Sequence, residues 1–432
     1  MIAHPQRALL HNELHARPRP PLSGPHRVSM FALVRPAAST IDPIEPLRTL
    51  CRDYRQPEPS PGQGHFFADF GTFRLKWERH GEFDDYTVYR AGADSANPFA
   101  QTALEVLPQD WIAALPGECI AAAHIVVLGA AADEAQRTPP PLAFDGDSLI
   151  AAGVGDSSAR VFTDMQLDAR GSTRFLLLDV TMSPTHTGRE VQRLIDIEMY
   201  RMMAMLAFPI ARSAAGELDR IEQELTSLAQ RLETAVPAQE PQLLGEVTHL
   251  AAMIERLSGE SNFRFSAARA YHSLVRQRGA ELREERLTGV QTLTGFLDRR
   301  FGPAMAFCDS VANRIEAAAQ RVARASSLLR TRVEIERETQ NQEMLAAMNR
   351  RASLQLRLQE TVEGLSVAAV TYYAVGLFGY LAKAAGSAGV PINPELATGL
   401  SVLPIALGVA LAIRYLRRSV LGRTAAEGHR DL

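Results

Sequence analysis

The sequence predicts an α+β fold: an N-terminal cytoplasmic α/β domain, a helical layer, a long stalk helix and a C-terminal two-helix transmembrane hairpin. Three observations lead to this prediction. Strand-like patterns occur before Pro184, and helical periodicity dominates after it. Between Ala304 and Leu365 there is no proline and a single glycine. Two segments without charged residues, 364–382 and 396–413, follow, and each is close to the roughly 20 residues that a helical span needs.

Residues 1–182 are predicted to form the cytoplasmic domain on a mixed or antiparallel sheet. A continuous apolar run over 119–128, bounded by Gly117 and Gly129, is typical of a buried central strand. Residues 66–77 contain a Gly-Thr turn between two apolar-rich stretches, which indicates a hairpin. Further strands are predicted over 28–34, 85–90, 159–167 and 174–181, the last two as an antiparallel pair, and a short helix is predicted over 108–115.

Residues 183–302 are predicted to form a helical domain. Pro184 suits the first turn of a helix, and the apolar residues of segment 189–207 indicate that this helix is buried. Leucine-rich seams over 218–232 and 243–257 repeat at alternating spacings of three and four, as in paired helices. A proline-containing turn separates the two seams, so we expect an antiparallel helical hairpin.

Residues 303–363 are predicted to form the stalk helix, beginning after Pro303. Apolar residues repeat at alternating spacings of four and three from Val311 to Leu329, and the repeat resumes loosely at Leu345. A helix that continues to residue 382 would be on the order of 120 Å long. Because a lone helix of that length is poorly supported, we expect the stalk to pack against partner helices.

Residues 364–413 are predicted to form the membrane hairpin, followed by a basic cytoplasmic tail over 414–432. Arginines flank both spans on the same side, whereas the loop between them carries one charge of each sign. The positive-inside rule therefore places both termini in the cytoplasm of a multi-pass protein of the bacterial inner membrane, with the lipid bilayer as a partner. No apolar run near the N-terminus indicates a signal peptide. The arginines are Arg350, Arg351 and Arg357 before the spans and Arg414, Arg417 and Arg418 after them.

A seam of hydroxyl groups on the first span is a candidate for lining a pore. Ser366, Tyr373 and Tyr380 are seven residues apart, which places them on one side of a helix. In an oligomer they would line a central pore and contact a partly hydrated cation. Alternatively, Tyr380 is an interfacial tyrosine, and the other two hydroxyls hydrogen-bond to a neighbouring helix.

A second candidate site lies near the N-terminus, where His11, Glu13 and His15 alternate. On a strand these three side chains would share one face and could bind a metal ion. The alternative interpretation is a polar strip that attaches the terminus to the body of the protein.

Composition argues against several other classes of function. The formal net charge is −3, so no strong electrostatic field favours nucleic acid. The cysteines, Cys51, Cys119 and Cys308, are widely separated, which fits a reduced compartment rather than a disulfide framework. The sequence contains no P-loop, zincin or nucleophile-elbow motif. We therefore expect neither an enzyme nor a cofactor.

Three segments resemble an uncharacterised bacterial family of predicted membrane-anchored proteins. They are residues 13–18 (ELHARP), 192–203 (QRLIDIEMYRMM) and 361–369 (TVEGLSVAA). The resemblance covers nearly the whole chain and implies a membrane anchor, without an established activity. The overall layout is also similar to that of CorA-type magnesium channels, pentamers in which the first span lines the pore. Their Gly-Met-Asn signature is absent here, where residues 378–383 read FGYLAK.

These observations lead to three hypotheses about function. The first is a membrane-anchored homo-oligomer that presents a scaffold or sensor body at the inner membrane. The second is a CorA-like ion channel or transporter with the first span around the pore. The third is a metal-dependent enzyme that uses the N-terminal histidines. The sequence specifies no ion or small-molecule ligand.

Overall fold

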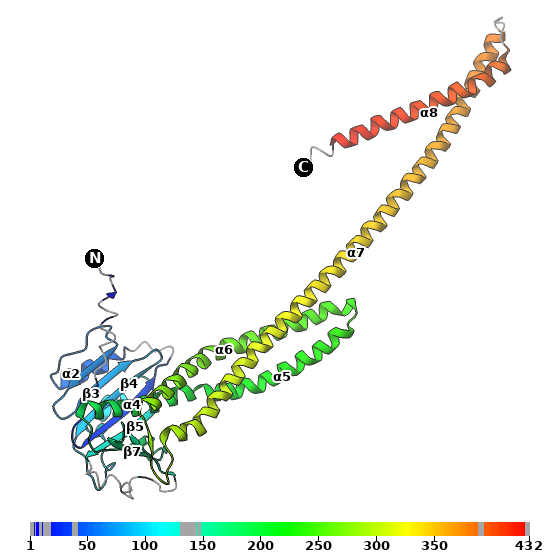
Figure 1. The fold of residues 1–432 in the computed structure, drawn as a ribbon. Coiled ribbons are helices and arrows are strands. Elements are labelled where there is room, and N and C mark those ends of the chain that lie inside the picture. The colour runs from blue at the N-terminus through cyan, green and yellow to red at the C-terminus, as the bar shows by residue number, and fades with distance from the viewer. Residues whose placement is uncertain are drawn as a thin grey trace. The chain divides into compact units, whose positions relative to one another are not determined.

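The computed structural model describes residues 19–36, 42–129, 148–387 and 393–427, together with residues 4, 6, 7, 11 and 144. The chain divides into two compact units, Met1–Leu329 and Arg330–Leu432. The first unit contains a sheet and the helices that cover it, and the second contains the rest of the longest helix and the final helix. Figure 1 gives the order of these elements along the chain.

The first unit is built on a nine-stranded mixed sheet in the order β2-β3-β4-β1-β5-β8-β7-β6-β9. Among the described strands only the β5–β8 pair is parallel, and the other neighbours are antiparallel. The strands are β1 His26–Val34, β2 His65–Asp69, β3 Arg74–Arg79, β4 Phe83–Ala91, β5 Glu118–Gly129, β6 Ile150–Val154, β7 Ala159–Thr163, β8 Thr173–Asp179 and β9 Glu285–Arg286.

Strand β5 is the middle strand, which confirms the central strand that the apolar run over 119–128 predicted. Ile125 and Val127 are buried on one face, and Val126 is buried on the other. Because both faces of β5 are covered, its sequence lacks the polar alternation of a half-exposed strand. The predicted hairpin is β2–β3, and the predicted antiparallel pair is β7–β8.

The two faces of the sheet belong to different cores. On β1, Val28 and Met30 face the core shared with the long helices, whereas Phe31 and Leu33 face a second core. The second core lies under α2 Ile44–Asp53, the short 3₁₀ helix η1 Ala103–Val106 and α3 Gln109–Ala113. This alternation follows from the two-residue period of a strand.

Helix α4 (Pro184–Met205) covers the first face, and a helical hairpin follows it. The Ser183 side chain caps α4, with Pro184 in its first turn. Helices α5 (Ala207–Thr234) and α6 (Glu240–Glu281) are joined through η3 (Pro237–Gln239) and lie side by side (Figure 1). Their predicted seams are buried, as Ile221 and Leu250 illustrate, which confirms the antiparallel hairpin.

Helix α7 runs from Leu293 to Ser387, so it begins ten residues before Pro303, and the prediction that it starts after this proline was wrong. Its N-terminus is capped by Glu284, whose carboxylate accepts hydrogen bonds from the backbone N–H groups of Leu293 (3.1 Å) and Thr294 (3.0 Å). A helix start that is satisfied in this way does not need a proline, and Pro303 lies inside the helix.

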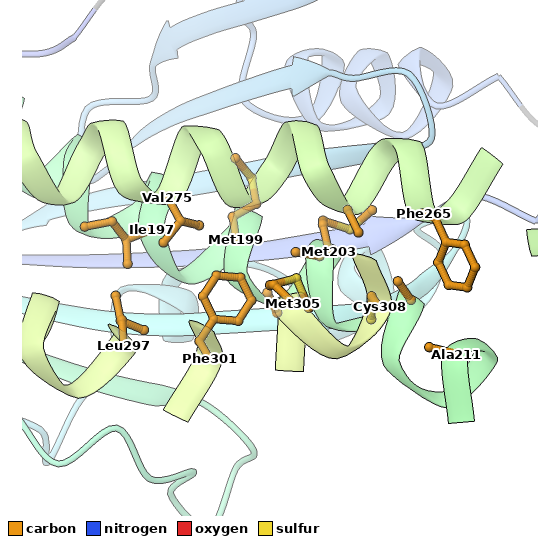
Figure 2. Packing of buried hydrophobic residues seen from close by; sticks show 14 of the residues in the cluster. Ile197, Met199, Met203, Ala211, Phe265, Val275, Leu297, Phe301, Met305 and Cys308 are labelled. Atoms are coloured by element: carbon orange, nitrogen blue, oxygen red, sulfur yellow. The ribbon is translucent and has the colours of Figure 1, made fainter. Parts of the chain in front are cut away.

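The first part of α7 packs within its own chain. Figure 2 shows Leu297, Phe301 and Met305 of α7 against Met199 of α4 and Val275 of α6. The seam from Val311 to Leu329 is also buried in the first unit. Up to residue 329, the partner helices that the stalk was expected to need are therefore α5 and α6 of the same chain.

The second unit contains α7 from residue 330 onward and α8 (Pro394–Glu427). The two helices are in close contact at Gly379, where an added Cβ would lie 3.2 Å from Cγ2 of Thr398. Ala382 and Ser401 are buried in the second unit, whereas most of its large apolar side chains are exposed.

Candidate functional site

Two described helices are long and apolar enough to cross a membrane, judged by length and composition. They are α7, through its segment 364–382, and α8. Leu365, Leu377 and Leu403 on these segments are between 67% and 81% exposed. Such a density of exposed apolar side chains marks a surface that contacts lipid or protein.

Two of the three predicted pore residues lie beside the same groove of the second unit. A cavity of about 810 Å³ between α7 and α8 is lined by Tyr373 and Tyr380, together with Lys383 and Glu395. Ser366 is not part of this lining, and its hydroxyl donates to the carbonyl oxygen of Val362 at 2.8 Å. The role of these three residues in a pore stays a prediction.

The other predicted sites fall at the edge of the described residues or beyond it. His11 is described and exposed, but Glu13 and His15 lie outside the described residues, so the metal site stays a prediction. Arg414 lies in α8. Arg417 and Arg418 continue that helix, and their side chains are outside the described part.

A buried polar network beneath α4 was not predicted. Lys76 of β3 is 3% exposed, and its Nζ donates to Glu78 Oε2 and to Gln192 Oε1, both at 2.8 Å. Gln192 Nε2 then donates to Asp196 Oδ1 at 2.7 Å, and Arg278 Nε donates to Asp196 Oδ2 at 2.8 Å. The network thereby joins the sheet, α4 and α6.

Glu78 of this network also belongs to a cluster with the composition of a metal site. Ligand atoms of Glu78, His80 and Asp85 all lie within 4.8 Å of one another. Burial alone would lower the pKa of Lys76, but the neighbouring Tyr89, Asp85 and Glu78 raise it above its ordinary value. The Lys76 ammonium is therefore charged and supplies the positive charge that a metal ion would bring. The arrangement fits an internal ion network better than a metal centre.

Sequence reasoning missed this network because alternation along β3 normally marks a solvent-exposed face. Leu75 and Trp77 alternate with Lys76 and Glu78 in the sequence, and the charged pair would be expected to face water. The available signal was that Lys76 is one of only two lysines in the chain.

The fold and the site define an α+β protein with a buried ionic network and two helices apolar enough to span a membrane. The chain belongs to the family described as "Protein of unknown function (DUF3422)", which matches residues 2–420. The chain matches no curated protein and no solved structure.

Proposed function

We propose that this protein is a membrane-anchored homo-oligomer that presents a scaffold or sensor body at the cytoplasmic face of the bacterial inner membrane. The observation that carries the proposal is how the surroundings of α7 change along its length. Its first part, to Leu329, is buried in the body, and residues 330–363 are largely exposed and rich in charge. The segment 364–382 that follows is apolar and uncharged.

Anchoring is supported by the surface of the two apolar segments. Exposure of these apolar side chains to water would be unfavourable, whereas contact with the hydrocarbon of a bilayer would not. Both segments are helical, so their backbone hydrogen bonds are made within the helix, as a membrane span requires. The arginines on either side, among them Arg357 and Arg414, favour cytoplasmic termini.

Anchoring can be tested by labelling single cysteines in spheroplasts with a membrane-impermeant maleimide. We expect Glu395→Cys, in a Cys119→Ser background, to be labelled from outside, and Ser353→Cys to be labelled only after lysis. Equal labelling of both positions in intact spheroplasts would refute the proposed topology.

Self-association is supported by an apolar seam on the exposed part of α7. Met344, Leu354, Leu358 and Leu365 are each more than 60% exposed. With Ala347, Arg351 and Thr361 they repeat at alternating spacings of three and four over residues 344–365. This spacing is typical of a helix that pairs with other helices in a coiled coil, and copies of the same chain are the partners that we propose.

The test is the subunit number of the full-length protein in detergent, measured by native mass spectrometry. We expect an oligomer that dissociates in the double variant Leu354→Glu/Leu358→Glu. The matched control is Leu356→Glu, because Leu356 is 55% exposed and lies off the seam. A monomeric wild-type protein would overturn self-association without affecting the anchor.

Ion transport is the second candidate, and the exposure of Tyr373 and Tyr380 on α7 favours it. Both side chains are about three-quarters exposed (76% and 75%), so their hydroxyls are accessible to a neighbouring subunit or to an ion.

A further inference from the structure

A pocket opens on the sheet face opposite α4, within the first unit. It has a volume of about 720 Å³, within the range of sites that hold small organic molecules. It is bounded by strands β1 and β5, by η1 and α3, and by the segment that precedes β8. Residues that line it include Phe31, Leu33, Ile112, Leu115, Ala122 and His124.

Among the polar residues that line this pocket, His124 is a buried one with an imidazole nitrogen left for a ligand. The residue is 4% exposed, and its Nδ1 lies 2.9 Å from Oγ of Ser29. That hydroxyl oxygen also accepts a hydrogen bond from the backbone N–H of Ala103 at 3.1 Å. Because Nδ1 is already bonded, Nε2 is the nitrogen that the imidazole offers to the pocket, and it has no hydrogen-bond partner within the described residues.

The charges around the pocket are compensated or absent. Burial lowers the pKa of His124 to about 4, so the imidazole is neutral at physiological pH. Arg170 at the rim is paired with Glu105 at 3.2 Å. Burial raises the pKa of the Cys119 thiol above its ordinary value, so this group is protonated. A ligand with a net charge would find no unpaired counter-charge in this lining.

The wall beside β5 is held in place by Gly117. Its φ is +123°, and an added Cβ would lie only 2.8 Å from the carbonyl oxygen of Val34. Only glycine tolerates both the conformation and the contact, so this turn fixes how Cys119 and Leu115 border the pocket.

We propose that the pocket binds a small, neutral, amphipathic organic molecule. Its apolar body would lie against Phe31, Leu33 and Leu115, and its single polar group would hydrogen-bond to Nε2 of His124. The site lies entirely within the first unit, so the proposal does not depend on the membrane anchor or on the oligomeric state.

Three probes that share one aromatic body can test the proposal: 1-naphthol, 1-naphthoate and 1-naphthylmethylammonium. The readout is alkylation of Cys119 by N-ethylmaleimide in the full-length protein, followed by peptide mass spectrometry. Cys119 is exposed and lines the pocket, whereas Cys51 and Cys308 are buried and report that the fold is intact. We expect 1-naphthol to slow alkylation of Cys119 several-fold and saturably, with both charged probes at least tenfold weaker.

Two variants locate the effect. In Ala122→Trp the added ring fills the pocket, so 1-naphthol should no longer change the alkylation rate. In His124→Leu the polar partner is lost, so 1-naphthol should protect Cys119 no better than naphthalene, a further probe that lacks the hydroxyl group. Alkylation of Cys51 or Cys308 in Ala122→Trp would mean that this variant does not fold correctly, and the His124→Leu comparison would then test the proposal. No protection by 1-naphthol, equal protection by all three probes, or full protection in a folded Ala122→Trp protein would overturn the proposal.

Discussion

The Nζ of Lys76 lies 2.8 Å from Oε2 of Glu78 beneath helix α4, and both residues are almost completely buried. A buried charge pair contributes little net stability compared with an apolar pair of the same shape. Removal of one partner, however, leaves an uncompensated charge and is strongly destabilising. The network from β3 to α6 therefore determines how α4 is positioned on the sheet.

Lys76→Met tests this relationship. The variant leaves the Glu78 carboxylate without its ammonium partner, so we expect the free energy of unfolding to fall by about 3–5 kcal/mol. The measurement is urea unfolding followed by near-ultraviolet circular dichroism, which reports packing around Trp77.

The controls separate charge from packing. Lys76→Met/Glu78→Gln removes both charges and should recover part of the loss. Lys383→Met changes the other lysine, which is exposed, and should leave the unfolding of the body unchanged. A double variant no more stable than Lys76→Met would mean that packing of the lysine stem, not charge, governs the effect.

The buried imidazole of His124 predicts a pH dependence of stability. Its pKa is lowered from 6.5 to about 4 in the folded protein, so the folded state binds fewer protons than the unfolded state in this interval. The stability contribution is complete above pH 6.5 and is lost as the pH falls toward 4. At 1.36 kcal/mol per pKa unit, the full loss is about 3 kcal/mol.

A comparison of wild-type protein with His124→Gln isolates this contribution from other titrating groups. Urea unfolding at pH 7 and at pH 5 should show a larger decrease for the wild type than for the variant. Parallel decreases in both proteins would show that the pKa of this imidazole is the same in the folded and the unfolded state.

The contact between Gly379 and Thr398 makes a prediction for the second unit. A side chain at residue 379 must displace Thr398, because a Cβ there would already lie 3.2 Å from Cγ2. We expect Gly379→Ile to separate α7 from α8 and to increase protease cleavage of the connecting residues in detergent. Gly376→Ile is the matched control, since an added Cβ at residue 376 has no neighbour within 4 Å. Equal cleavage of the two variants would show that this contact does not hold the hairpin together.

Local patterns predicted the strands and helices whose surroundings are uniform. The run over 119–128 is apolar because both faces of β5 are covered, and the seams of α5 and α6 are regular because they pack on each other. The short strands β6 and β9 and helix α2 carried no comparable signal and were not predicted. The start of α7 was misplaced because its cap comes from Glu284, which lies outside the helical pattern.

The polar sites were harder to predict because their partners are distant in sequence. Gln192 lies 116 residues after Lys76, and His124 lies 95 residues after Ser29. No spacing rule joins such pairs. The hydroxyl seam on α7 could be proposed from the sequence because it repeats within a single helix, but its role in a pore stays a prediction.

The seam over residues 344–365 of α7 also makes a prediction about ion flux. In a parallel oligomer, Arg351 of every subunit would face the shared axis, about 22 Å from Ser366 along the helix at 1.5 Å per residue. A ring of guanidinium groups repels cations. We therefore expect proteoliposomes of the full-length protein to show no Mg²⁺ or K⁺ flux above that of empty vesicles. Flux that disappears in Tyr373→Ala but persists in Tyr372→Ala, a neighbour that is equally exposed at 76%, would instead support the channel and contradict the scaffold.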